Sequence, residues 1–153
     1  MKIKKKFILS LILTIVIFTF FSSTLKNKLI KSDKDVRTSA KIMVNMIQEN
    51  YNNGDFFKIY NTGTDDFKKL TSENDFFLLM KRKKEVLGDF VSSTLMVSNV
   101  INSNVVILTY RSTYENYSLI EEFQFIRKDK KNELQLGTYF IDDGGKKGEV
   151  IRQ

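Results

Sequence analysis

The strongest constraint on the fold is a change in the spacing of apolar residues near Gly88. Before Gly88, apolar side chains recur at every third or fourth position, as on one face of a helix. After Gly88, apolar and polar residues alternate, and β-branched and aromatic residues become frequent, as in half-buried strands. Helices followed by strands that are joined by short turns predict an α+β fold with an antiparallel sheet.

Two to three helices are expected before Gly88. The first carries one apolar stripe and ends at the polar residues 52–54. The members of that stripe are Val36, Ala40, Met43, Val44, Ile47 and Tyr51. A short second helix is expected at 55–60, followed by a turn at 61–64. The third begins near Ser72, where Asp75 three residues later resembles a capping box, and it ends at Gly88.

Four strands are expected after Gly88, and polar residues between them supply the turns. Their predicted ranges are 89–101, 104–114, 118–128 and 133–141. Because the connections are short, neighbouring strands should be antiparallel. We therefore predict a curved four-stranded antiparallel sheet that packs against the helices and closes like a cone.

The N-terminus has the composition of a membrane-targeting segment. Lys2, Lys4, Lys5 and Lys6 precede an uncharged apolar run at 7–25. Nineteen helical residues span about 28 Å, close to the thickness of a hydrocarbon core. Residues 1–25 are thus either a signal anchor or a cleaved signal peptide, and 26–35 form a linker. The positive cluster predicts a single-pass protein of the cytoplasmic membrane, with its N-terminus inside and its domain outside, or a secreted domain after cleavage.

The composition excludes several kinds of chemistry. The chain has no Cys and no His, so disulfides, thiol nucleophiles and a Ser-His-Asp triad are impossible. We expect no metal site and no cofactor. The net charge is +7, but the lysine cluster at the N-terminus supplies four of those charges. The basicity is therefore explained by targeting, and we predict no nucleic-acid binding.

The segments NNGDFFKIY, SENDFFLLMKRKKEVLG and SLIEEFQFIRKDKKNELQLGTYFI resemble the nuclear-transport-factor-2-like (cystatin-like cone) fold. Within that fold, the chain is similar to uncharacterised bacterial membrane-targeted or secreted families. Gly137 and Tyr139 match the terminal strand of those families, while Leu134 stands where they carry a tryptophan. The resemblance covers 36–141 and implies a cone with a concave inner face, followed by a flexible tail at 142–153. Because these motifs serve packing and turns, they predict a fold and not an activity.

Four residues are candidates for a ligand site inside such a cone. Alternation places Glu121 on one strand face with Leu119, Phe123 and Phe125, where burial would raise the pKa of its carboxyl group. Alternatively the register differs by one residue, so that Glu122 takes that place and Glu121 is one of the glutamates that strand edges commonly carry. The other candidates are Arg111, which could pair with Glu121 or bind an anion, and the rim aromatics Tyr60 and Tyr139. The basic run 81–84 is interpreted as a solvated helix end.

The sequence therefore favours a membrane-tethered extracytoplasmic binding or interaction domain without catalytic residues. Its partners would be the membrane, through the N-terminal helix, and a protein partner or a second copy that docks through the sheet. Two alternatives stay open. One is an immunity-like or accessory protein of a secreted effector, and the other is a small-substrate enzyme that uses a pocket carboxylate. A filled cone would favour the interaction domain, and an open pocket with a raised carboxyl pKa would favour the enzyme.

Overall fold

The computed structural model describes residues 32–127, 133–142 and 151–152. Residue contacts divide the chain into two units, 1–35 and 36–153, and the second unit contains the fold described below. The predicted membrane segment at 7–25 lies outside the described residues. Within the described ranges, no helix is long and apolar enough to cross a membrane. Residues 32–35, which were predicted to belong to a linker, are already helical.

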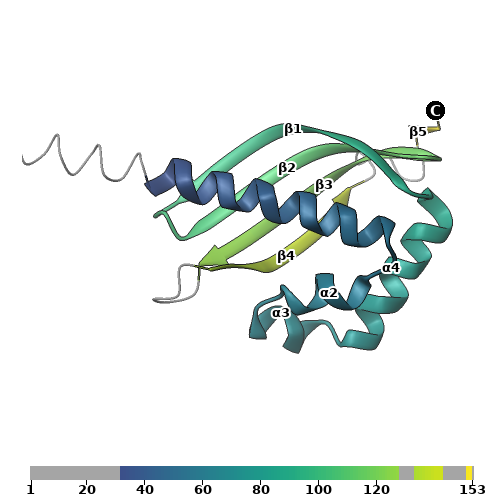
Figure 1. Cartoon of the computed structure of the whole chain (residues 1–153), viewed down its shortest axis with the longest axis horizontal. Helices are drawn as coiled ribbons and strands as arrows, with labels where there is room; N and C mark the ends of the chain where they lie inside the picture. The colour runs from purple at the N-terminus through teal and green to yellow at the C-terminus, as the bar shows by residue number, and fades with distance from the viewer. Residues whose placement is uncertain (1–31, 128–132, 143–150, 153) are drawn as a thin grey trace, which may run out of the picture. The chain divides into compact units, whose positions relative to one another are not determined.

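The predicted α+β class and the order of helices before strands are confirmed (Figure 1). The helices are a long one over residues 32–52, α2 (Phe56–Asn61), α3 (Asp65–Leu70) and α4 (Glu73–Leu87). The strands are β1 (Phe90–Ile101), β2 (Val105–Tyr114), β3 (Tyr117–Arg127), β4 (Leu134–Asp142) and β5 (Ile151–Arg152). The first four strands form one antiparallel sheet in the order β1-β2-β3-β4.

The strand bounds agree with the prediction to within about one residue, because the turns have strong local signals. Asn102 and Ser103 both adopt positive φ, with values of 51° and 55°. Such angles suit the mirror-image turns whose twist matches a hairpin. The C-terminal region differs from the predicted tail at 142–153. Asp142 belongs to β4, and β5 pairs with Tyr117 and Ser118 at the start of β3.

A single core lies between the long helix and one face of the sheet, which we call the inner face. The predicted helical stripe is buried at Val36, Ala40, Val44, Ile47 and Tyr51. The inner face contributes alternating buried side chains from the strands. These are Val106, Leu108, Tyr110, Ser112, Tyr114, Leu119, Glu121, Phe123, Phe125 and Leu136. The helix crosses this face (Figure 1).

Helix α3 was not predicted, although its ends carry standard signals. The Thr64 hydroxyl accepts a hydrogen bond from the backbone N–H of Phe67 at 3.1 Å. Asp65 and Asp66 occupy the first turn, and Lys68 and Lys69 occupy the last, which suits the helix dipole. At six residues the helix is too short to show an apolar period, so only these end signals could have revealed it.

Helix α4 begins and ends as predicted. The Ser72 hydroxyl accepts from the backbone N–H of Asp75 at 3.2 Å and lies 2.6 Å from the Asp75 carboxylate. Gly88 ends the helix at φ +77°. A Cβ at Gly88 would also lie only 2.4 Å from Oε2 of Glu115. Position 88 therefore requires glycine both for its backbone angle and for space.

Candidate functional site

Glu121 lies in the middle of β3 on the inner face, and its exposed fraction is only 1%. Its neighbours on that face, Leu119, Phe123 and Phe125, are buried as well, so the predicted register is confirmed. Glu122 faces the opposite side and is exposed. The carboxylate of Glu121 therefore sits inside the hydrophobic core, where a charge needs a partner.

The partner of Glu121 is Lys83 of α4. The Lys83 Nζ lies 2.7 Å from Oε1 of Glu121, and the exposed fractions of the two side chains are 6% and 1%. Nζ also lies 2.6 Å from the hydroxyl oxygens of Tyr114 and Tyr139. An ammonium group has three protons to donate, and these three acceptors use all of them.

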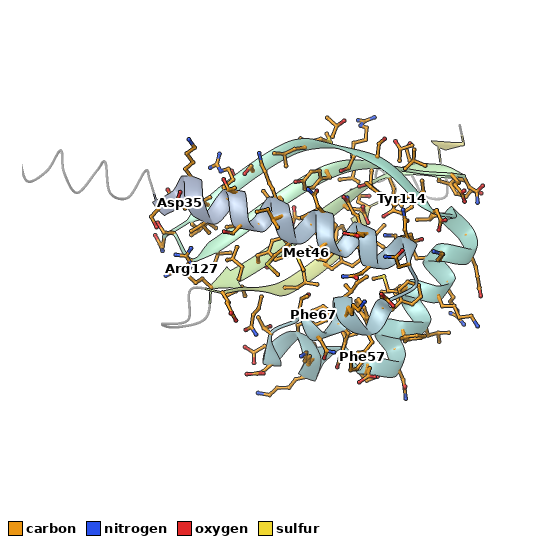
Figure 2. The ribbon with its side chains drawn as sticks, viewed as in Figure 1. Asp35, Met46, Phe57, Phe67, Tyr114 and Arg127 are labelled. Atoms are coloured by element: carbon orange, nitrogen blue, oxygen red, sulfur yellow. The ribbon has the colours of Figure 1, made fainter. Side chains whose placement is uncertain are left out.

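The two tyrosines complete a closed network. Each hydroxyl accepts from Lys83 and donates to Oε1 of Glu121, over 2.8 Å in the case of Tyr114. The ammonium also lies 4.4 Å from the ring centroid of Tyr51 and 4.5 Å from that of Tyr114, within range of cation–π attraction. We call Lys83, Glu121, Tyr114 and Tyr139 the inner cluster. Figure 2 shows Tyr114 at the end of the sheet near α4.

The charge state of Glu121 differs from the prediction. Burial by itself would raise the pKa of the carboxyl group, but the Lys83 ammonium and its hydrogen bond outweigh burial and hold the pKa below its usual value. The hydroxyls of Ser112 and Tyr139 act in the same direction. The predicted rise in pKa was wrong because the cationic partner on α4 was not anticipated. Glu121 is thus an ionised carboxylate at neutral pH.

The same surroundings shift the pKa of Lys83, of the two cluster tyrosines and of the adjacent Tyr51. Burial lowers the pKa of the Lys83 ammonium, and the Glu121 carboxylate opposes that effect. Burial, followed by the negative charge of Glu121, raises the pKa of Tyr51, Tyr114 and Tyr139. The tyrosines are therefore neutral hydrogen-bond donors at neutral pH.

Very little free space remains beside the inner cluster. The cavity next to it has a volume of about 10 Å³ and is lined by Gln48, Tyr51, Met80 and Leu136 together with the cluster itself. That is close to the space that one water molecule requires. Among the described residues, Oε2 of Glu121 and the buried Ser112 hydroxyl have no hydrogen bond of standard geometry. The space between the long helix and the inner face is therefore filled by side chains.

The predicted pairing of Arg111 with Glu121 is wrong. Arg111 is exposed on β2 and lies opposite Ile120, whereas Glu121 lies opposite Tyr110. Since side chains alternate between the two faces of a sheet, Arg111 and Glu121 point to opposite sides. By the same alternation Arg111 shares a face with Val105, Ile107 and Thr109, and that face is the outer one.

The two predicted aromatics lie in different places. Tyr139 belongs to the inner cluster, as described above. Tyr60 lies on α2 and is buried outside the cluster, where its hydroxyl donates to the backbone carbonyl of Thr71 at 3.1 Å. Its ring packs against Phe67 and Phe76. Tyr60 thus joins the short helices and is not a member of the site.

The sequence interpretation missed Lys83 of the inner cluster. It was assigned to a solvated basic run, yet its exposed fraction is 8%. The buried face of α4 is Phe76, Met80, Lys83 and Leu87, whose spacing of four, three and four residues is that of a single helical stripe. A lysine within that stripe was the available signal. By contrast, Leu79 and Val86 of the same helix are 47% and 55% exposed.

No family model and no curated protein matches the chain. In the ranges that the structure describes, no group of three or more acidic side chains is placed to hold a metal ion.

Proposed function

We propose that this chain is a membrane-tethered, extracytoplasmic interaction domain that acts through its surface and carries out no catalysis. The observation that supports this most directly is the filled inner face. A cavity of about 10 Å³ beside the inner cluster leaves no room for a small-molecule substrate on the inner face. Ligand pockets usually enclose about 300 Å³ or more. The topology in this proposal rests on the lysine cluster and the apolar run at 7–25.

The alternative of an enzyme with a pocket carboxylate has less support. A general acid or base must lie within hydrogen-bond reach of the substrate and titrate near the working pH. Glu121 is 1% exposed, its pKa is held below the ordinary range, and Oε1 accepts three hydrogen bonds from within the protein. These are the properties of a structural ion pair that joins α4 to the sheet.

The outer face of the sheet, on the side opposite the inner cluster, offers a surface for a protein partner. Val97, Ile101 and Phe140 are 44%, 48% and 58% exposed there. Apolar side chains that are surrounded by polar ones are typical of protein-binding surfaces. Phe140 lies directly opposite Glu122, which gives the surface such a mixed character. We propose that the partner, a different protein or a second copy, docks through the sheet.

The topology is tested by fusing a reporter after Gln153 that is active only outside the cytoplasm. Activity outside the cytoplasm is the expected result, because the positive cluster retains the N-terminus inside. The matched control is the same fusion to a chain in which Lys2, Lys4, Lys5 and Lys6 are replaced by glutamine, which should reduce the exported fraction. A reporter that is active only inside the cell would refute the proposal.

The docking surface is tested by placing a photo-crosslinking amino acid at Phe140 in the full chain within cells. A discrete adduct of higher mass is expected from this position. The matched control is Val86 of α4, whose exposed fraction of 55% is close to the 58% of Phe140. Equal adducts from both positions would show that the outer face is not a preferred surface.

A further inference from the structure

Strand β1 forms a long and uncharged edge of the sheet. Its twelve residues, FVSSTLMVSNVI, include no Lys, Arg, Asp, Glu or Pro. Natural edge strands are usually protected by such residues, or by being short or covered, because unpaired backbone groups invite another strand to pair with them. β1 is neither short nor charged, so the protection that it has is limited to the two register shifts at Val91 and Met96.

The first residue of β1 shows how this edge accepts hydrogen bonds. The side-chain amide of Asn52 donates to the backbone carbonyl of Phe90 at 2.9 Å, and the backbone N–H of Phe90 donates to Oδ1 of Asn52 at 2.7 Å. One carboxamide thus pairs with both backbone groups as the peptide unit of a neighbouring strand would. Between Val91 and Val100, the residues that the structure describes provide no hydrogen bond to the backbone on this outward side.

The orientation of Phe90 identifies which residues present their backbone outward. Because both backbone groups of Phe90 turn away from β2, alternation gives the same orientation to the other residues whose side chains face inward. These are Ser93, Leu95, Ser98 and Val100. The register shifts at Val91 and at Met96 do not change this orientation. After each shift, the residues with inward side chains still turn their backbone groups away from β2.

The opposite edge of the sheet is partly occupied. The backbone N–H of Leu136 in β4 donates to the carbonyl of Thr62 at 2.8 Å, and the N–H of Thr64 donates to the carbonyl of Leu136 at 2.9 Å. Gly63 thus forms a parallel bridge with Leu136 near the start of β4. Among the described strands, β1 is therefore the longer and more accessible edge.

We propose that β1 pairs in antiparallel fashion with β1 of a second copy, so that one continuous sheet runs through a two-fold symmetric dimer. Pairing an edge with itself closes at two copies, whereas pairing two different edges would continue into a fibre. The uncharged strand meets itself without like charges. Val91 and Met96, which are 60% and 51% exposed, lie along the same strand.

This dimer rests on the proposed function, since it supplies one partner of the interaction domain, but it uses the edge and leaves the outer face to a different protein. Pairing along the whole of β1 places the two-fold axis beside Leu95 and Met96, the middle of the strand. Charges introduced at Met96 in both copies would thus meet across the axis.

The test is the oligomeric state of the full chain in detergent, measured by sedimentation equilibrium for the wild type and for Met96→Lys. The wild type should be a dimer, and Met96→Lys should weaken the dimer on the order of a hundredfold, because like charges across an interface are strongly unfavourable. Met96→Glu should do the same. An equal mixture of the two variants should restore dimers, which shows that both variants are folded.

Two matched lysine substitutions separate the possible results. Val86→Lys on α4, at 55% exposure, and Phe140→Lys on the outer face, at 58%, should leave the dimer intact. A monomeric wild type, a Met96→Lys variant that remains dimeric, or a mixture that fails to restore dimers would overturn the inference. Loss of the dimer in Phe140→Lys but not in Met96→Lys would also overturn it, while it would support docking through the outer face as the proposed function states.

Discussion

The two faces of the sheet place the same type of residue, a glutamate, in opposite environments. On the inner face, Glu121 is 1% exposed and shares its Oε1 with one ammonium and two hydroxyl groups. On the outer face, its neighbour Glu122 is exposed and lies 3.3 Å from the Thr109 hydroxyl. The carboxylate inside depends on its protein partners, whereas the carboxylate outside is solvated by water.

This difference separates stability from interaction. A buried ion pair adds little net stability compared with apolar residues of similar size, but removing one partner leaves a charge stranded in the core. The inner cluster therefore holds α4 against the sheet only as a complete set. Exposed residues of the outer face and of the β1 edge can change with little effect on folding, and so they are free to serve a partner.

The largest expected effect is that of Lys83→Met. The substitution leaves Glu121 buried without its cation, and we expect the free energy of unfolding to fall by about 3–5 kcal/mol. Chemical denaturation followed by tyrosine fluorescence measures the change. Lys81→Met, on the exposed side of the same helix, is the control and should change stability by less than about 0.5 kcal/mol. Equal effects of the two substitutions would mean that Lys83 is not paired inside the core.

A smaller loss is expected from Gly88→Ala at the start of the sheet. Gly88 has φ +77° and ψ −159°, a region that only glycine adopts readily, so the strain should cost about 1–3 kcal/mol. Gly54→Ala is a matched control, because Gly54 has φ +74° but no atom within 4 Å of the position of a Cβ. Thermal unfolding should show a greater loss for Gly88→Ala, since its Cβ also meets Glu115. A greater loss of stability for Gly54→Ala than for Gly88→Ala would contradict the close contact between Gly88 and Glu115.

The pH dependence of the free energy of unfolding tests the buried one of the two carboxylates, Glu121. Because the pKa of Glu121 is lower in the folded protein, its contribution is present above the ordinary carboxyl pKa of about 4.3 and is lost as pH falls through the folded value. The reference is an apolar-cluster variant that combines Lys83→Met, Glu121→Leu, Tyr114→Phe and Tyr139→Phe. Denaturation between about pH 3 and pH 7 should show a steeper acid loss for the wild type. Parallel profiles would refute the ionised state of Glu121.

The smallest effect is expected from Arg111→Ala. Arg111 is exposed on the outer face and lies on the opposite side of the sheet from Glu121, so stability should change by less than about 0.5 kcal/mol. Combined with Glu121→Gln, it should show no coupling beyond experimental error, because the two residues share no partner. A coupling above about 1 kcal/mol would mean that the two side chains interact after all.

Much of the fold was predictable from the sequence, because local signals determine it. The turn at Asn102–Asn104, the stop at Gly88 and the period change set the strand bounds directly. Helix α3 was missed because six residues are too few for a periodic pattern. The position of Glu121 was predictable from alternation within one strand, whereas its partner was not. Lys83 lies 38 residues away on another element, and its pairing depends on how the helix packs on the sheet.

The central claim is that the inner cluster is structural and that the surface carries the interactions. The apolar-cluster variant tests it most directly, through its free energy of unfolding and its dimer dissociation constant measured on the same preparation. We predict a folded protein that recovers most of the stability lost in Lys83→Met, with a dissociation constant within about threefold of the wild type. A variant that folds normally but no longer associates would contradict the claim, because the cluster would then take part in binding. A variant that remains as unstable as Lys83→Met would equally contradict it.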